Sequence, residues 1–287
     1  MPRVTVIIPT FNYAPVLPYS IGSVLRQSFD DFELLVIGDH CIDESESVVT
    51  AIADPRVRWI NLAEGVGHQS GPNNEGLRQG RGEFIAYLGH DDLWLPRHLE
   101  LAIKAIDAGA DLSYALTEMV RPGDAEPWCA PAEREYKPGM WIPPTNVVHR
   151  REAAIKVGLW KHFIDVPDKD PESDLWERIY KAGYRVQFIR MLTAVKFSAL
   201  KRKGVYTERP CHEQAAWSKR IIEEPDFVAT ELAKMLPKLE EPEPFTVAAH
   251  KFVTDTLERV RRRLRRSKPQ PTRKQIYEDR LKFKGVK

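Results

Sequence analysis

The sequence VTVIIPTFN, residues 4–12, contains the segment that decides the fold. Its first five residues form an unbroken β-branched run, which is typical of a strand buried on both faces in a parallel sheet. We expect this strand to end at Pro9, because proline has no N–H to donate to a neighbouring strand. Thr10, Phe11 and Asn12 then follow the strand at the edge of a sheet.

Strands and helices alternate downstream of this segment. The apolar spacing predicts, in order, helix 16–25, strand 32–37, a helix with a capping-box-like start at Asp43 and Glu46, strand 57–62, helix 74–79, strand 83–88, helix 96–108 and strand 111–116. This alternation predicts a doubly wound, mainly parallel α/β sheet. Ligands bind beyond the carboxyl ends of the strands in such sheets, so Thr10, Asp39 and the pair Asp91-Asp92 are expected to share one cleft.

The second half of the chain has a different character. Residues 121–144 are rich in proline and glycine and predict a long loop. Helical patterns at 151–157 and 174–182 and a strand pattern at 184–189 indicate an extension of the same domain. We therefore expect one α/β domain over residues 1–222 and a helical, basic C-terminal extension over residues 223–287.

Composition excludes several classes of protein. The chain has 43 Lys and Arg against 41 Asp and Glu, so its total charge does not favour nucleic acid as a partner. Its three cysteines, Cys41, Cys129 and Cys211, are far apart and form no C-x-x-C pair, which argues against a disulfide framework or a zinc site. The apolar runs are too short for an export signal or a membrane span. We expect a cytoplasmic protein.

Two adjacent carboxylates, Asp91 and Asp92, follow the apolar run 84–88. Such groups repel each other unless a cation or hydrogen bonds compensate them. Mg²⁺ and Mn²⁺ prefer oxygen ligands and are commonly held by one or two carboxylates together with substrate phosphates. Asp92 could instead cap the following helix. The pair alone leaves both interpretations open.

Asp39 ends the second predicted strand. A carboxylate at this position can accept the imide N–H of uracil or thymine, or the N1–H of guanine, whereas cytosine offers no such donor. A turn or capping aspartate is the alternative interpretation of the same residue.

Several segments together resemble a known family. Residues 4–12, 32–43, 73–88 and 89–92 are similar, in order and spacing, to the motifs of family 2-like inverting GT-A glycosyltransferases. The segment DLWER at residues 174–178, followed by Gly183, resembles a later motif of the same family. The likeness covers the chain to about residue 189 and is absent from its last part.

The resemblance implies a GT-A fold and an inverting transfer of sugar from a nucleoside-diphosphate sugar, UDP- or dTDP-linked above all, to the hydroxyl of a glycan or glycoconjugate. Within residues 1–222, it implies a nucleotide-binding half at 1–116 and an acceptor-side half at 117–222. It assigns donor binding to Pro9, Thr10, Phe11, Asn12, Asp39, Asn74 and Asp91. It assigns a divalent metal cofactor, Mn²⁺ or Mg²⁺, to Asp91 and Asp92.

An inverting mechanism also needs a carboxylate that deprotonates the acceptor hydroxyl. The family places this base just upstream of its D-L-W motif, and the matching stretch here is residues 170–174. Glu172 falls at the position of the base, and Asp174 follows two residues later. Both are candidate catalytic residues, and Glu172 is preferred. The alternative interpretation is a solvated helix N-terminus, where negative charges interact favourably with the helix dipole. It explains Asp174 well and Glu172 less well.

Two departures from the family pattern keep rival functions open. Gly38 stands where the family has an aspartate, and Gly89 stands where its metal motif has the first carboxylate. A catalytically weak or inactive sugar-nucleotide-binding protein would explain both glycines. A sugar-nucleotide nucleotidyltransferase is the other rival, but it would need a glycine-rich loop after the first strand, where this chain has residues 9–12.

The predicted terminal helix, residues 252–266, has apolar side chains on one side and many arginines around it. An amphipathic basic helix can lie on an anionic membrane surface, which would give the protein peripheral contact with the inner face of a membrane. It can equally be a solvated helix that packs on the domain.

Overall fold

The segment at residues 4–12 forms the centre of a sheet. In the computed structural model, strand β1 (Val4–Thr10) pairs in parallel with β2 (Phe32–Gly38) on one side and with β4 (Phe84–Tyr87) on the other, and β3 (Val57–Asn61) pairs with β2. The four strands are parallel, and β1, β2 and β4 are almost wholly buried, as the continuous β-branched run of β1 predicts, whereas β3 at the edge of the sheet is partly exposed.

The other half of the sheet is mixed. Strand β6 (Leu112–Val120) is parallel to β9 (Val186–Phe197), whereas β8 (Val147–Arg150) is antiparallel to both β4 and β6. The short strands β5 (Leu93–Trp94) and β7 (Trp128–Ala130) pair antiparallel with β9 and β6. The described strands thus form one nine-stranded sheet in the order β3-β2-β1-β4-β8-β6-β9-β5, with β7 on β6.

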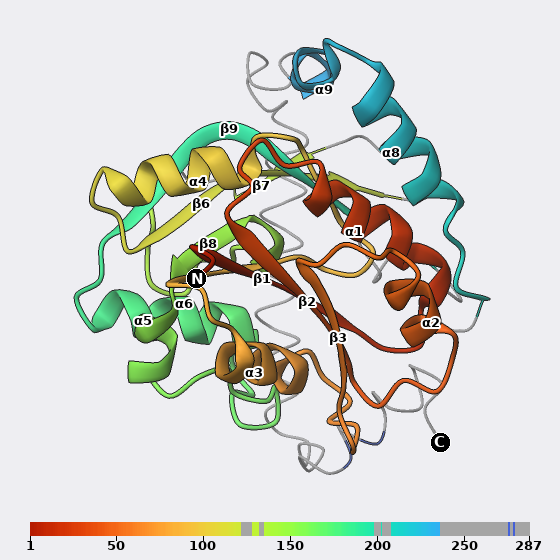
Figure 1. The fold of residues 1–287 in the computed structure, drawn as a ribbon. Helices are drawn as coiled ribbons and strands as arrows, with labels where there is room; N and C mark the ends of the chain where they lie inside the picture. The colour runs from red at the N-terminus through yellow and green to blue at the C-terminus, as the bar shows by residue number, and fades with distance from the viewer. Residues whose placement is uncertain are drawn as a thin grey trace, which may run out of the picture. The chain divides into compact units, whose positions relative to one another are not determined.

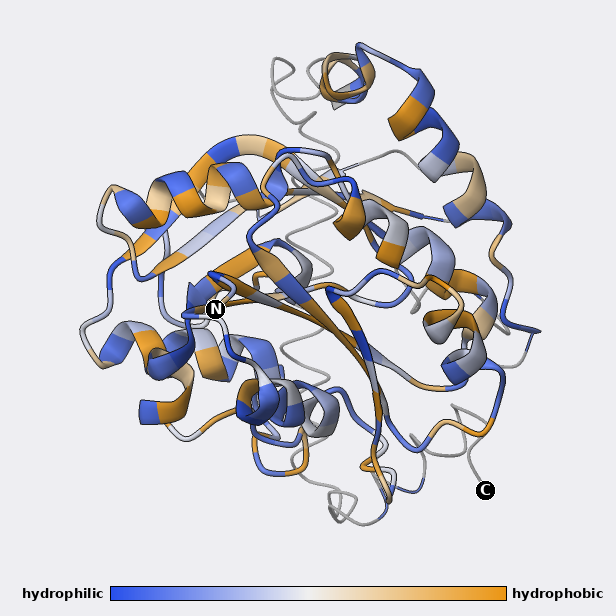
Figure 2. Cartoon of the chain, in the orientation of Figure 1, coloured by the Kyte–Doolittle hydropathy of each residue, from blue (hydrophilic) through white to orange (hydrophobic). Residues whose placement is uncertain are grey.

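Helices cover both faces of this sheet (Figure 1). Helices α1 (Leu17–Leu25) and α4 (His98–Asp107) pack on the face to which Val6 and Ile8 point. Helices α3 (Ser70–Gln79), α5 (Arg151–Lys156) and α6 (Pro171–Lys181) pack on the face of Ile7. Figure 2 shows hydrophobic and hydrophilic residues alternating along these helices, as expected of elements with one buried side. The predicted doubly wound α/β fold is confirmed.

The structure describes residues 1–121, 128–131, 135–197, 202, 208–235, 275 and 278. The chain divides into two compact units, Met1–Pro225 and Asp226–Lys287. In the second unit, helix α9 (Phe227–Met235) is described, and the predicted basic helix at 252–266 lies outside the described residues. None of the described helices combines the length and the apolar character that crossing a membrane would require.

Several element boundaries differ from the prediction. Strand β1 continues through Pro9 to Thr10. Pro9 costs no hydrogen bond there, because its nitrogen faces the side of β4, whose pairing with β1 has already ended at Tyr87. The predicted loop 121–144 contains β7, and α8 (His212–Glu223) was not predicted as a helix. Asp43 does not form a capping box with Glu46; its carboxylate accepts the Ser45 N–H and hydroxyl.

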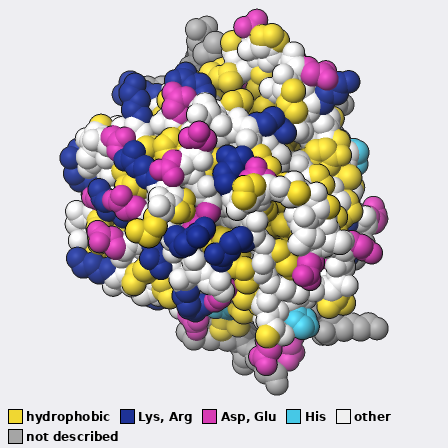
Figure 3. Space-filling model, in the orientation of Figure 1, with side chains coloured by type: hydrophobic (Ala, Val, Ile, Leu, Met, Phe, Trp, Pro, Cys, Tyr) yellow, Lys and Arg dark blue, Asp and Glu magenta, His cyan; other side chains and the backbone are white. Residues whose placement is uncertain are grey.

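Acidic and basic side chains are interspersed on the face of the molecule shown in Figure 3. Ion pairs of the described surface include Arg97 with Glu100 at 2.7 Å, where both side chains are largely exposed. Such exposed pairs contribute little to stability, because solvent and salt screen them.

Candidate active site

The carboxyl ends of β1, β2 and β4 meet at one edge of the sheet. Thr10 pairs with Gly38, and the N–H of Leu88 donates to the carbonyl of Ile7. The Thr10 hydroxyl lies 3.0 Å from Nδ1 of His90, which joins the end of β1 to the segment that carries the acidic pair. The structure thus brings the predicted residues of the first strand next to Asp91 and Asp92, as the parallel topology requires.

The turn after β1 is held by Asn12, which is buried and adopts a φ of 46°. Asparagine tolerates this left-handed conformation better than most residues. Its Oδ1 accepts the N–H of Ile42 at 2.8 Å, so it ties this turn to the loop that follows β2. Phe11, next to it, is half-buried. Asn12 therefore fixes the relative position of the turn after β1 and the loop after β2.

Asp39, at the end of β2, is buried and holds the loop that follows β3. Its Oδ1 accepts the N–H of Val66 and its Oδ2 accepts the N–H of Gly67, both at 2.7 Å. Gly67 has a φ of 69°, a conformation that glycine adopts without steric cost. Asp39 therefore joins the end of β2 to the loop that follows β3.

Gly38 is closely packed. A Cβ at this position would lie 2.5 Å from Oδ1 of Asn61 and 2.8 Å from the Trp59 ring. Asn61 in turn exchanges two hydrogen bonds with the backbone of Cys41, at 2.8 and 2.9 Å. The side chains of β3 therefore fill the space that a second aspartate would take, so the glycine is matched to its neighbours.

Asp92 is fully buried in an internal ion pair. Its Oδ2 lies 2.9 Å from Nζ of Lys196 and also accepts the Thr145 hydroxyl, and its Oδ1 accepts the N–H of Phe197 at 3.1 Å. The antiparallel pairing of Leu93 with Val195 brings Asp92 beside Lys196. Donors from the protein thus surround this carboxylate, whereas the sequence predicted one shared metal-binding role for Asp91 and Asp92.

Asp91 is half-buried and lies in different surroundings. Burial and the adjacent Asp92 carboxylate raise the pKa of Asp91 to about 7, while Lys196 acts in the opposite direction. Its backbone carbonyl accepts the side-chain amide of Gln214 at 3.3 Å, which fixes its position from α8. Of the acidic pair, Asp91 is the partly exposed residue, whereas Asp92 is fully buried.

Gly89 makes the fold of this segment possible. A Cβ at this position would lie 2.6 Å from Oδ2 of Asp92 and 3.3 Å from Oδ1 of Asp91. The N–H of Asp92 donates to the carbonyl of Gly89 at 3.0 Å, which closes a tight turn. The glycine at the first position of the acidic motif therefore leaves room for the Asp92 carboxylate to point inward.

Glu172 lies in the first turn of α6, after the N-terminal residue Pro171. Its Oε1 accepts the indole N–H of Trp141 at 3.0 Å. Burial raises the pKa of Glu172, while the Trp141 hydrogen bond and the charge of Lys196 act in the opposite direction. Among Glu172, Asp91 and Asp92, the residue in direct contact with the Lys196 ammonium group is Asp92, at 2.9 Å.

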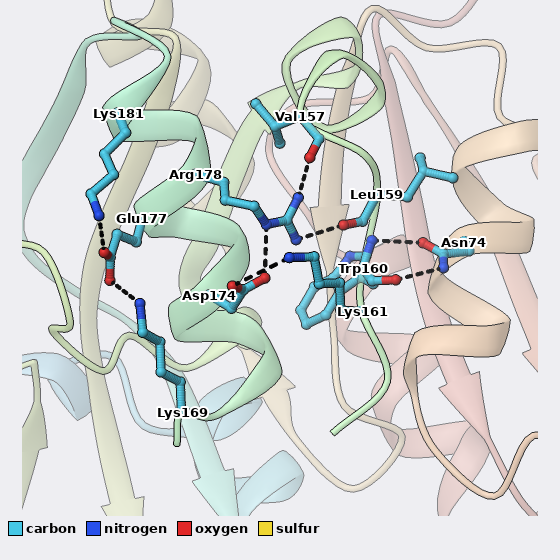
Figure 4. Close-up of polar contacts among 10 residues, drawn as sticks. All are labelled: Asn74, Val157, Leu159, Trp160, Lys161, Lys169, Asp174, Glu177, Arg178 and Lys181. Atoms are coloured by element: carbon cyan, nitrogen blue, oxygen red, sulfur yellow. Dashed lines mark hydrogen bonds and ion pairs between the residues drawn. The ribbon is translucent and has the colours of Figure 1, made fainter. Parts of the chain in front are cut away.

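Asp174, the other candidate base, has a visible structural role (Figure 4). Its Oδ2 accepts Nε of Arg178 at 2.7 Å, and its Oδ1 lies 3.9 Å from Nζ of Lys161. The same Arg178 guanidinium donates to the carbonyls of Val157 and Leu159. Asp174 therefore orients the arginine that holds the segment 157–161 against α6.

Asn74 holds the same segment from α3. Its side-chain amide donates to the carbonyl of Trp160 and accepts its N–H, both at 2.9 Å (Figure 4). Beside this contact lies a cavity of about 480 Å³. It is lined by Leu62, Ala63, Glu64, Val66, Ser70, Gly71, Asn74, Arg78, Trp160 and His162. Asn74 thus contributes to the site wall by fixing the backbone opposite α3.

Lys196, Thr145 and Trp141 are site residues that the sequence did not reveal. None of them lies in a recognisable motif, and Lys196 is about 100 residues from its partner Asp92. The contact depends on the pairing of β5 with β9, and β5 has two residues, too few for a periodic pattern.

The carboxylates of the site can be compared with the ligands that a divalent cation requires. Within the described ranges, no group of three or more His, Cys, Asp or Glu side chains is arranged to hold a metal ion. Mg²⁺ and Mn²⁺ are also bound by one or two carboxylates together with substrate phosphates. Asp91 fits this smaller requirement, since Asp92 is engaged by Lys196 and Thr145.

Comparison with known proteins adds to this geometry. Residues 5–206 match the profile of glycosyl transferase family 2. The chain is 34% identical over 100 residues to the Escherichia coli UDP-Glc:alpha-D-GlcNAc-diphosphoundecaprenol beta-1,3-glucosyltransferase WfgD. This match covers 35% of this chain and 39% of that protein. It is 39% identical over 103 residues to the Staphylococcus aureus poly(ribitol-phosphate) beta-N-acetylglucosaminyltransferase TarP, covering 35% and 32% of the two chains. The matches thus span well under half of each relative.

Solved structures show the same fold at low identity. Residues 1–349 of S. aureus TarS in complex with UDP-GlcNAc superpose with a TM-score of 0.57 at 16% identity, covering 81% of this chain and 72% of that one. The mannosyltransferase PcManGT from Pyrobaculum calidifontis, in complex with GDP-Man and Mn²⁺, gives 0.56 at 19% identity, covering 99% and 86%. The fold expected from the motifs is confirmed: the chain has the GT-A fold and belongs to glycosyl transferase family 2.

Proposed function

We propose that the chain transfers a sugar, with inversion, from a nucleoside-diphosphate sugar to the hydroxyl of a glycan or glycoconjugate. The observation that carries this proposal is the edge of the sheet at which the ends of β1 and β2 meet the turn of the acidic pair, where the Thr10 hydroxyl lies 3.0 Å from Nδ1 of His90. Membership of glycosyl transferase family 2 supports it, as do the sugar donors and acceptors in the names of the relatives.

We infer that Asp39 binds the nucleobase of the sugar-nucleotide donor. A carboxylate at this strand end can accept the imide N–H of uracil or thymine. Thr10, Phe11 and Asn12 line the neighbouring part of the pocket from the end of β1, after the strand residue Pro9. A UDP-sugar bound to a fold relative, TarS, supports a uridine donor here.

Asp39→Asn tests whether Asp39 binds the nucleobase. We expect UDP to bind about 10- to 100-fold more weakly, because the amide presents a donor where the imide needs an acceptor. CDP should lose far less affinity, because its N3 can accept that new donor. Titration calorimetry of both nucleotides gives the ratio. Equal losses for UDP and CDP would mean that Asp39 acts through the loop at Val66 and Gly67 alone.

The diphosphate would lie beside Asp91. A divalent cation held by Asp91 and the phosphate oxygens would stabilise the charge that develops on the departing nucleoside diphosphate. Asp91 itself fixes the position of this end of the donor at the turn after β4.

The acceptor hydroxyl would lie between Glu172 and the anomeric carbon of the donor. Glu172 takes the hydroxyl proton as the oxygen attacks this carbon, and the nucleoside diphosphate leaves from the opposite face with the bonding electrons. Trp141 holds the Glu172 side chain in place for this step.

The acceptor is expected at a membrane surface. The E. coli relative is named for an acceptor linked to diphosphoundecaprenol. The arginine-rich stretch at 252–266 has the charge to contact anionic lipids. This part of the proposal rests on the composition of that stretch and on the relative.

The proposed function is tested by nucleotide binding and by turnover. We expect UDP with Mn²⁺ to raise the melting temperature, since ligand at 100 times its Kd stabilises by about 2.7 kcal/mol. We also expect slow release of UDP from a UDP-sugar when water acts as acceptor. Binding without any release would identify a sugar-nucleotide-binding protein. Exchange of pyrophosphate into the donor would identify a nucleotidyltransferase. No response to any nucleoside diphosphate would contradict the proposed transferase and the sugar-nucleotide-binding protein alike.

A further inference from the structure

The segment at residues 210–214 leads into α8 and contacts two turns of the candidate site. Gln214, in the first turn of α8, is 3% exposed, and its side-chain amide donates to the backbone carbonyl of Asp91 at 3.3 Å. Tyr13, in the turn after β1, is 1% exposed, and its hydroxyl donates to the carbonyl of Pro210 at 2.6 Å. Two buried polar side chains thus join this segment to the acidic turn and to the turn after β1.

The same two turns also contact each other directly. The ring of His90, next to Asp91, lies edge-on to the Tyr13 ring, with 5.1 Å between the ring centroids. Nδ1 of His90 lies 3.0 Å from the Thr10 hydroxyl. The contacts therefore form a closed series, from Tyr13 through the segment at 210–214 to Asp91 and back through His90. The position of the acidic turn depends on each contact of this series.

Helix α8 is itself fixed to the domain. The Ser218 hydroxyl accepts a hydrogen bond at 3.3 Å from Arg26, which follows α1, and α1 lies beside α8 (Figure 1). The Trp217 ring meets the Phe197 ring edge-on, with 6.1 Å between the centroids, and the N–H of Phe197 donates to Asp92. Helix α8 is thus a fixed support from which a side chain can hold the acidic turn.

We propose that Tyr13 and Gln214 are positioning residues of the donor site: together they hold the acidic turn against the turn after β1, so that Asp91 stays in place for the diphosphate end of a nucleotide and its cation. This inference rests on the proposed function, in which Asp91 binds there. It gives a part in donor binding to α8, which lies beyond the residues 5–206 that match the family profile.

The physical reason is that a site held in place before binding loses less conformational entropy when its ligand binds. Without the Gln214 amide, the Asp91 carbonyl loses its hydrogen-bond donor on α8, and the ligand must order the turn itself. The loss then appears as weaker binding of a cation and diphosphate at Asp91. If the two residues merely stabilised the fold, their loss would lower the melting temperature and leave the affinity of the folded protein for nucleotide and cation unchanged.

The experiment is calorimetric titration of the full chain with UDP in Mn²⁺ and in EDTA, which gives the factor by which Mn²⁺ tightens binding. In Gln214→Met, a side chain of similar size without the N–H donor, this factor should fall by about three- to tenfold, the equivalent of one hydrogen bond. Tyr13→Phe should lower it to a similar extent. The Kd for UDP in EDTA should stay within about twofold of the wild-type value.

Ser218→Ala is the matched control. It removes the hydrogen bond to Arg26 one turn further along α8, and it should keep the wild-type Mn²⁺ factor. The double variant Tyr13→Phe with Gln214→Met should lose much less than the product of the two single losses, because both residues act through the segment at 210–214. Melting temperatures identify the variants that are folded.

The outcomes separate this inference from the proposed function. An unchanged Mn²⁺ factor in the folded single variants, or an equal fall in Ser218→Ala, would overturn the inference alone. Independent losses in the double variant would overturn the joint action of the two residues. A wild-type chain that binds UDP neither in Mn²⁺ nor in EDTA would overturn the proposed function as well.

Discussion

Glu172→Gln is expected to lose transfer by roughly 10²- to 10⁴-fold while it binds the donor nucleotide normally. The amide keeps the size of the side chain, and its Oε1 can still accept the Trp141 N–H, so the start of α6 should not move. It cannot take a proton from the acceptor hydroxyl. UDP release from the sugar donor measures the rate, and calorimetric titration with UDP measures binding.

Glu177→Gln is the matched control for this variant. Glu177 lies on the same helix and pairs with Lys169 and Lys181 (Figure 4). It should retain near-normal turnover. Normal turnover in Glu172→Gln, together with a large loss in Asp174→Asn, would move the role of base to Asp174.

Asp92→Asn is expected to destabilise the folded state by about 3 kcal/mol, the low end for breaking a buried ion pair. The substitution removes the counter-charge of Lys196 and places an amide donor among three donors. In a unit of 225 residues this corresponds to a fall in melting temperature of roughly 6–12 °C. Scanning fluorimetry or calorimetry without nucleotide measures it.

Asp91→Asn is the adjacent control, and it should give the opposite result. Its half-buried side chain leaves the Lys196 pair intact, so the melting temperature should stay within about 2 °C. Metal-dependent turnover should instead fall by roughly a hundredfold or more. Equal destabilisation by the two variants would show that Asp91 and Asp92 share one structural role.

Much of the fold could be predicted because its information is local. The β-branched run at residues 4–8 and the alternating patterns up to residue 116 indicate the parallel strands and their covering helices, and the topology then places Asp39 and Asp91 at one edge. Boundaries were less predictable where neighbours decide them. Helix α6 begins at Pro171, before the apolar pattern from which the sequence predicts it, and β1 runs through Pro9 because no β4 partner remains there.

The roles of individual carboxylates could not be predicted in the same way. Asp174 and Glu172 are two residues apart in one acidic stretch, yet Asp174 faces Arg178 and Glu172 faces Trp141. Asp91 and Asp92 are adjacent, yet Asp91 is partly exposed and Asp92 is buried against Lys196. Sequence spacing predicts the helix face or the strand end on which a carboxylate lies. It does not predict the partner of that carboxylate where the partner belongs to a segment far along the chain.

Gly89 has a consequence for how this site could have diverged or could be redesigned. A Cβ at residue 89 would approach Oδ2 of Asp92 to 2.6 Å, so a carboxylate cannot be added there while Asp92 points inward to Lys196. The two positions are epistatic. Restoring a full acidic motif would require the Asp92–Lys196 pair to be dismantled first, and the order of the substitutions would decide whether the intermediate folds.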